Sequence, residues 1–116
     1  MNYLKLLQTL KKDLNTSNIE FETVKFFRKD FVSVWIWFCV LEQYYNKNNH
    51  NIENIMSEIP NEYASRPTIF KIIDDAVSKK YFEKILDEKD KRKYNLFPAP
   101  QTIKEFEQWA KVFKGF

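Results

Sequence analysis

One apolar run, FVSVWIWFCVL from Phe31 to Leu41, constrains the fold of this chain more than any other segment. It is about half as long as the roughly 20 residues that a membrane-spanning helix needs, and charged residues stand on both sides of it. We therefore predict a buried helix over residues 30–46, with Asp30 as its N-cap. Because apolar residues cover more than one face, this helix is either central in the domain or shared with a partner.

The composition is typical of a single folded domain, and no residues are grouped as in an active site. The chain has 116 residues, 44% of them hydrophobic and 30% charged, which suits one core. Its one glycine, Gly115, excludes glycine-rich phosphate loops. Cys39 lies in the apolar run and is predicted to be a small buried hydrophobe, while His50 is predicted to lie in a surface loop. We therefore expect no catalytic residues, no metal site and no cofactor.

The cysteine count and the N-terminal segment indicate the cellular compartment. A single cysteine cannot form a disulfide within the chain, which favours a reducing environment. The start, MNYLKLLQTLKKD, lacks the apolar stretch and cleavage site of a signal peptide. We expect a soluble, cytoplasmic protein with no membrane partner.

Two short helices are predicted to meet across a tight turn. Ile52–Ile59 carries isoleucines and a methionine on one face, and residues 60–64 form the connection. The second helix, over residues 65–80, begins with Ser65 as a plausible N-cap and has an apolar back. This order is typical of a helix-turn-helix, and a short helix with a polar front suits a DNA major groove. An ordinary amphipathic helix with a solvated face is the alternative for this stretch taken alone.

Beyond Lys80 the apolar period changes from 3.6 to 2, which predicts a β-hairpin. Two short extended runs, residues 81–86 and 94–97, flank a charged turn at residues 87–93. A last helix with an apolar stripe follows, and Thr102 is predicted to cap it. The fold class is therefore mainly α with a small β-hairpin, a winged helix-turn-helix.

The N-terminal segment allows more than one interpretation. Residues 2–15 carry leucines at three- and four-residue steps, which form an apolar stripe on a helix that could pack on its own domain or on a second copy. Residues 19–25 fit either a helix opened by a capping box at Ser17 and Glu20 or a partly alternating strand. We divide the single domain (1–116) into an N-terminal helix and connection that can dimerise (1–29), a winged-helix core (30–100) and a C-terminal helix (101–116).

Three strings resemble the MarR group of bacterial winged-helix transcription regulators. They are SRPT at residues 65–68, KKYF at 79–82, and the wing string DKR at 90–92, which is followed by a strand and by PQT at 100–102. The resemblance implies that Arg92 reaches into the minor groove and that Asp90 braces the wing. Members usually have a glycine where Tyr81 stands, so the turn after the second helix must differ here.

Two functions remain open at this stage. The first is a DNA-binding transcription regulator with helix 65–80 in the major groove, wing 87–93 in the minor groove and double-stranded DNA as its partner, acting as a homodimer through the N- and C-terminal helices. The second is a protein–protein interaction module without nucleic acid, favoured by the modest net charge of +3 and by Asp74 and Asp75. For DNA binding, the residues predicted to meet base edges and phosphates are Ser65, Arg66, Thr68 and Lys71. The predicted phosphate contacts are Lys79, Lys84, Lys91 and Lys93, and the predicted minor-groove contact is Arg92.

Overall fold

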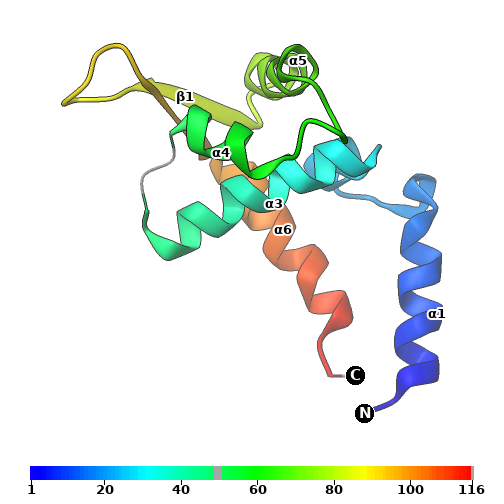
Figure 1. Cartoon of the computed structure of the whole chain (residues 1–116). Helices are drawn as coiled ribbons and strands as arrows, with labels where there is room; N and C mark the ends of the chain where they lie inside the picture. The colour runs from blue at the N-terminus through cyan, green and yellow to red at the C-terminus, as the bar shows by residue number, and fades with distance from the viewer. Residues whose placement is uncertain (49–50, 116) are drawn as a thin grey trace.

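The computed structural model describes residues 1–48 and 51–115, so the predicted loop residue His50 lies outside the described residues. Within these ranges the chain forms six α-helices and one antiparallel hairpin (Figure 1). The expected mainly α architecture with a small hairpin is confirmed. The elements are α1 (Tyr3–Leu14), the 3₁₀ turn η1 (Thr16–Asn18), α2 (Glu22–Phe27), α3 (Phe31–Asn46), α4 (Ile52–Glu58), α5 (Arg66–Ser78), β1 (Phe82–Leu86), β2 (Tyr94–Pro98), α6 (Pro100–Ala110) and the 3₁₀ turn η2 (Lys111–Phe113).

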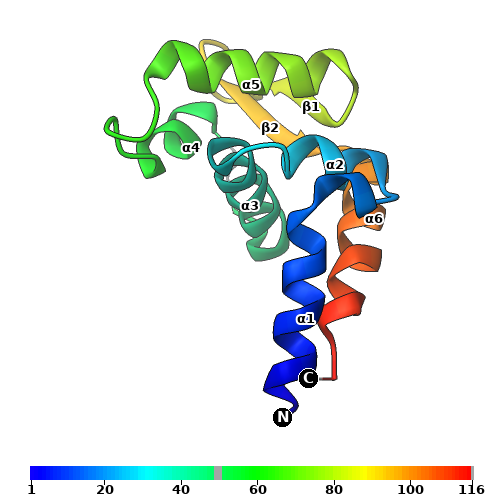
Figure 2. The ribbon, with the colours of Figure 1, turned by 90° about the vertical axis from the view of Figure 1, so that its right-hand side faces the viewer.

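The molecule consists of a body, formed by α2 to α6 and the hairpin, and an arm, formed by α1. Its radius of gyration is 15.2 Å, whereas a compact chain of this length should have roughly 13 Å. Figure 2 shows the reason: α1 extends away from the body beside the end of α6, whereas α5 and the hairpin lie at the opposite end. The arm contacts the C-terminal turn η2.

The centre of the body is α3, as the apolar run predicted. The Asp30 carboxylate accepts a hydrogen bond from the Ser33 amide at 2.8 Å and caps the helix. Ile36, Trp37 and Val40 are completely buried. Cys39 is also buried, and burial raises the pKa of its thiol, so its predicted role as a small hydrophobe is confirmed. None of the helices in the described ranges combines the length and the apolar character needed to cross a membrane.

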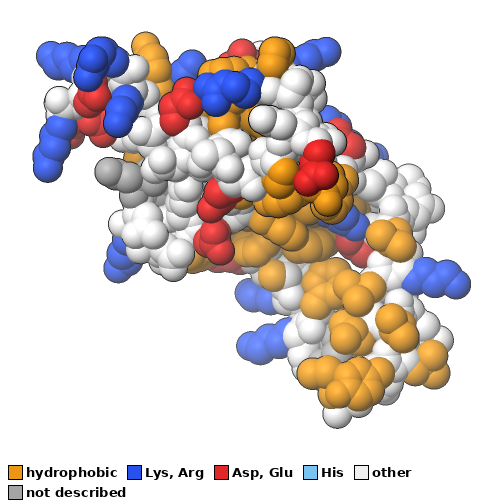
Figure 3. All heavy atoms as spheres, viewed as in Figure 1, with side chains coloured by type: hydrophobic (Ala, Val, Ile, Leu, Met, Phe, Trp, Pro, Cys, Tyr) orange, Lys and Arg blue, Asp and Glu red, His pale blue; other side chains and the backbone are white. Residues whose placement is uncertain are grey.

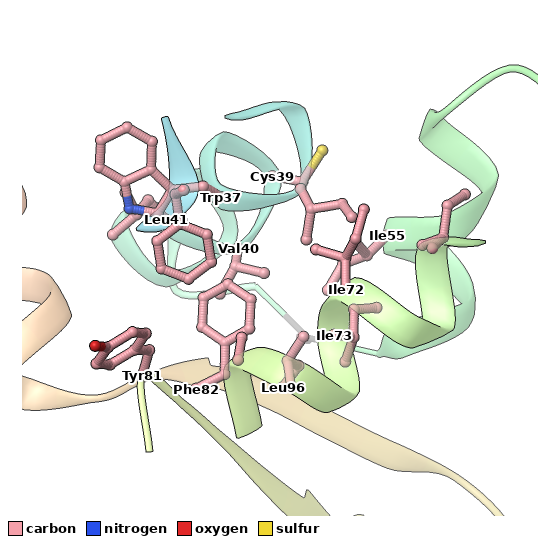
Figure 4. Close-up of a cluster of buried hydrophobic side chains, with 14 of the residues drawn as sticks. Trp37, Cys39, Val40, Leu41, Ile55, Ile72, Ile73, Tyr81, Phe82 and Leu96 are labelled. Atoms are coloured by element: carbon pink, nitrogen blue, oxygen red, sulfur yellow. The ribbon is translucent and has the colours of Figure 1, made fainter. Parts of the chain in front are cut away.

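The two short helices α4 and α5 form as predicted. Ser65 Oγ accepts from the Thr68 amide at 3.4 Å at the start of α5, and proline occupies the first turn, where a missing N–H costs little. Figure 4 shows Ile72 and Ile73 of α5 directed into the same cluster as Val40 of α3. The predicted apolar back of α5 is buried at all four positions, namely Ile69, Ile72, Ile73 and Ala76.

The turn after α5 is built without glycine. Lys80 takes the left-handed conformation, with φ 64°, and the Tyr81 amide donates to the Ala76 carbonyl at 2.9 Å. The positive φ therefore falls one residue before the position where a glycine was expected. Burial, followed by a hydrogen bond to Glu22 of α2, raises the pKa of Tyr81 to about 12, so the phenol remains protonated and ties this turn to α2.

The predicted hairpin is present, with the register Phe82↔Pro98 to Leu86↔Tyr94. The prediction that Thr102 caps the last helix is wrong. Helix α6 begins earlier, because Pro100 provides a preset first turn behind Ala99 at the N-cap. Thr102 then lies one turn inside, completely buried, and its hydroxyl donates to the Tyr81 carbonyl at 2.7 Å.

The ambiguous segment after α1 is neither a strand nor a helix capped by Ser17. Ile19 is extended and buried, and the helix α2 starts only at Glu22. Its position is fixed by α6: the Glu105 carboxylate accepts from the Thr23 amide at 2.9 Å and from the Thr23 hydroxyl at 2.8 Å. Together α2 and α6 close the core below Tyr81.

Candidate nucleic-acid interface

The end of the body opposite the arm presents α5 and the hairpin together. Figures 1 and 2 agree that both elements lie at this end, and Figure 3 shows lysine and arginine side chains gathered at the hairpin tip. The nine residues predicted to contact DNA are all exposed: Ser65, Arg66, Thr68 and Lys71 on the first half of α5, Lys79 just after it, Lys84 on β1, and Lys91, Arg92 and Lys93 in the turn between the strands.

The first turn of α5 offers hydrogen-bond donors, and these side chains already have partners within the protein. Ser65 Oγ lies 3.0 Å from Thr68 Oγ1, so the two hydroxyls share one hydrogen bond. The Arg66 guanidinium donates to both carboxylate oxygens of Glu53, on α4, at 3.0 Å. Both partners are more than half exposed, so this ion pair is weak and the arginine can exchange it for an anion of a ligand.

Lys71 projects from the outer face of α5. At 100° per residue Asp74 lies on the same face, so a cation and an anion alternate there. Asp75 lies nearer to the body, where its charge acts on Lys29. Lys79 closes the helix, with its ammonium 5.9 Å from the centre of the Phe26 ring.

The hairpin tip is held by Asp87, a residue whose role the sequence analysis missed. Its carboxylate accepts from the amides of Lys89 and Asp90 at 3.0 and 2.7 Å and from the Asn95 side chain at 3.0 Å. These bonds, the Asn95 side chain first, hold the pKa of Asp87 below its usual range. An aspartate that accepts from amides two and three residues later is the mark of an Asx turn, and that spacing is visible in the sequence.

Asp90 holds both the backbone and the side chain of Arg92 within the hairpin tip. Its Oδ1 accepts from the Arg92 amide at 3.1 Å and from the Arg92 Nε at 3.2 Å. The bonds from Arg92 lower the pKa of Asp90, so this carboxylate stays ionised at neutral pH. The Arg92 side chain nevertheless remains 91% exposed, with the outer part of its guanidinium turned to solvent.

The remaining lysine side chains lie near the hairpin tip. Lys84 holds its ammonium 4.6 Å from the centre of the Tyr94 ring across the hairpin. Over residues 79–93 there are seven lysines and arginines against four acids. Two of those acids, Asp87 and Asp90, direct their oxygens into the loop, so the outer surface of the tip is more positive than the composition alone indicates.

The hairpin is also joined to the start of α4. Asn51 forms an antiparallel bridge with Asn95, the same residue that donates to Asp87. The base of the tip is therefore fixed to the helix pair rather than attached only through its two strands. Sequence periodicity could not reveal this bridge, because it involves one residue on each side.

Within residues 1–48 and 51–115 no group of three or more His, Cys, Asp or Glu side chains is arranged to hold a metal ion. The nine predicted contact residues carry hydroxyl, ammonium and guanidinium groups, which are donors for an anionic ligand, and the exposed carboxylates of Glu53 and Asp74 lie among them. Comparison of the chain with protein-family models, with curated proteins and with solved structures finds no match.

Proposed function

We propose that this chain is a winged helix-turn-helix protein of MarR-like type that binds double-stranded DNA and regulates transcription in the cytoplasm. Helix α5 enters the major groove, and the hairpin tip at residues 87–93 lies along the adjacent minor groove. The observation that carries the proposal is the presence of the donor-rich first half of α5 and the cation-rich tip at one end of the body.

The geometry of the tip supports a minor-groove role. An arginine at the end of a hairpin suits a narrow, electronegative groove. Asp90 and Asp87 fix the backbone around Arg92 before any ligand arrives, so little conformational entropy is lost on binding. The Asn51 bridge supports the tip in the same way.

The proposal includes a homodimer formed through the terminal helices. Every residue of α1 is exposed or half-buried, although its leucines repeat as they would in a packed helix. A two-fold dimer would present two copies of α5 to successive major grooves, which is how helix-turn-helix dimers recognise palindromic sites.

The test is retardation of a mixed pool of genomic duplex fragments in a gel, over a series of salt concentrations. Affinity should fall linearly with the logarithm of salt, because phosphate contacts release counterions. Arg92→Ala should cost roughly 1–3 kcal/mol of binding free energy if the contact is base-specific. The matched control is Lys104→Ala, which removes the same charge from exposed α6 and should leave affinity unchanged.

The second candidate is a winged-helix protein-interaction module that binds no nucleic acid. Asp74 on the outer face of α5 favours it, because a carboxylate there repels phosphates. Absence of retardation at low salt, together with recovery of a stable protein complex from lysate, would select this alternative. Equal retardation by wild type and Arg92→Ala would leave DNA binding in place but remove the tip from the interface.

A further inference from the structure

The arm carries an apolar stripe that the described residues of its own chain leave largely exposed. Leu7 is 62% exposed and Leu14 is 70% exposed, although both lie on a regular helix capped by Asn2. The half-buried residues of α1 are Leu6, Thr9 and Asp13, and at 100° per residue they face a different direction from Leu7 and Leu14. The contact with η2 therefore uses one side of α1 and leaves the leucine side open.

The body has a second uncovered apolar surface, on the outer side of α3. Phe31 is 65% exposed, and Tyr63, in the turn before α5, is 54% exposed. With Trp35 they form a triangle of rings, with centroids 5.5–5.9 Å apart. We call Phe31, Trp35, Phe38 and Tyr63 the aromatic surface. The buried side of α3 fills the core, so the all-round apolar character of this helix serves two separate contacts.

A groove continues the aromatic surface toward the end of α3. It has a volume of about 400 Å³ and is lined by Trp35, Phe38, Cys39, Glu42 and Glu58. Three of its five lining residues are apolar, and both charged ones, Glu42 and Glu58, are acidic. A groove of this kind accepts a helix that presents apolar side chains at i, i+3, i+4 and i+7 with cations beside them.

The leucine stripe of α1 has this pattern. Leu7, Leu10 and Leu14 follow one another at three- and four-residue steps, and Lys11 is exposed on the same side of the helix. The charges are complementary, since lysine accompanies the leucines and glutamate accompanies the aromatic rings. The same chain therefore carries both halves of a helix-in-groove contact.

The two surfaces are arranged so that one chain cannot join them but two can. Figure 3 shows hydrophobic side chains over the arm and over the body on one and the same face. A two-fold axis that lies parallel to that face, between the arm and the body, turns a second copy to face the first. The arm of each copy then lies on the body of the other. The contact then occurs twice in one dimer, so neither surface remains free to bind a third copy.

The apolar area supplies a large part of what such a dimer needs. Aromatic side chains bury about 150–250 Å² each when covered completely, so the exposed halves of three rings supply on the order of 300 Å². The leucine stripe adds a similar amount on the same copy. This approaches the roughly 800 Å² per partner of a stable interface before any polar rim is included.

We propose that two copies of this chain associate by reciprocal docking, with the leucine stripe of each α1 on the aromatic surface and acidic groove of the other copy's α3. The inference rests on the homodimer of the proposed function and names the surface to which the arm binds. It is independent of DNA, so it is tested without DNA.

The first experiment measures mass by sedimentation equilibrium on the full chain. The wild type should be a dimer, and Leu7→Glu and Phe31→Glu, one on each surface, should both be monomers. Both side chains are largely exposed, so the substitutions leave the core intact, which circular dichroism verifies. Ile85→Glu, an exposed hairpin residue on neither surface, is the matched control and should remain dimeric.

The second experiment identifies which surfaces meet. In a Cys39→Ala background, Leu7→Cys and Phe38→Cys are prepared as separate proteins, mixed and oxidised. The mixture should form a disulfide-linked dimer, whereas each protein alone should not. Crosslinking of Leu7→Cys by itself would show α1 against α1 and overturn the proposal, as would a monomeric wild type or a dimer unaffected by Phe31→Glu. DNA retardation of the monomeric variants reports separately on the proposed function.

Discussion

The body and the arm contain equally regular helices, yet the described part of the chain covers the apolar side chains of the body far more completely than those of the arm. In α3 the residues Ile36, Trp37 and Val40 are completely buried. In α1 every residue is exposed or half-buried, although the leucines repeat as they would in a packed helix. A periodic apolar stripe thus indicates that a helix has a packing surface, but not which molecule covers it.

The largest expected difference concerns the core. Trp37→Ala should destabilise the chain by about 3–5 kcal/mol, because it leaves a cavity under α6 next to Phe106 and Trp109. Leu7→Ala, on the arm, should change the stability of the monomer by less than about 0.5 kcal/mol. Urea unfolding at low protein concentration measures both. A cost for Leu7→Ala as large as for Trp37→Ala would contradict the division into body and arm.

The next effect concerns the contact between α6 and the turn after α5. Thr102→Val keeps the shape of the side chain but removes the hydroxyl that donates to the Tyr81 carbonyl. We expect a loss of about 0.5–1.5 kcal/mol, the usual net contribution of one hydrogen bond, because the Tyr81 carbonyl still accepts from the Ala99 amide. Thr102→Ser, which retains the hydroxyl, is the control for chemical denaturation. Equal stability of the two variants would show that the hydrogen bond contributes nothing.

A smaller effect is expected at Lys80. A left-handed residue other than glycine carries backbone strain of order 1–3 kcal/mol, so Lys80→Gly should raise stability by up to about 1 kcal/mol once the added flexibility of the unfolded chain is subtracted. The thermal midpoint, compared with that of Lys89→Gly in the hairpin tip, measures it. A lower midpoint for Lys80→Gly would mean that this turn is not strained.

The smallest expected effect concerns the order of the hairpin tip at low pH. The folded pKa values of Asp87 and Asp90 lie below 3.8, so the order they give to the tip is fully present above 3.8 and is lost as the pH falls through those lower values. At low pH the amides of Lys89 and Asp90 should therefore lose their protection, so that their exchange rates approach the intrinsic rates at that pH. The α3 amides should keep their protection. Asp87→Ala, which removes the acceptor oxygens, should show the open tip already at neutral pH. An unchanged tip in that variant would mean that the Asx turn is not what holds it.

The difference between body and arm also explains how far the sequence could predict the structure. Helices α4 and α5 were predictable because their apolar periods match the faces that are buried, and α3 because of its continuous apolar run. In the hairpin the change of period predicted the strands but not their burial, since Ile85 and Leu86 are exposed. Thr102 was misjudged, because a threonine before an apolar stripe has the pattern of a cap and only the position of Pro100 moves the start of the helix. Residues 19–25 could not be assigned, because the helix that begins within them is positioned by tertiary contacts of Thr23 with Glu105.

The candidate interface was predictable in composition but not in geometry. Charges on a polar face of a helix are expected to be exposed, and all nine predicted residues are. The ion pair of Arg66 with Glu53 and the brace at Asp87 depend on how separate segments meet, which single-chain periodicity does not encode. Only the structure shows these contacts, although an aspartate at the start of a charged turn, as at Asp87, was a usable signal.

The most direct test of the central claim, that α5 and the hairpin tip contact one duplex together, is a titration of isotope-labelled protein with DNA followed by amide chemical shifts. The account predicts concerted changes at residues 65–71 and 87–93, saturating at the same DNA concentration, with residues 3–14 unaffected. Changes confined to one of the two segments, or centred on the arm, would contradict it.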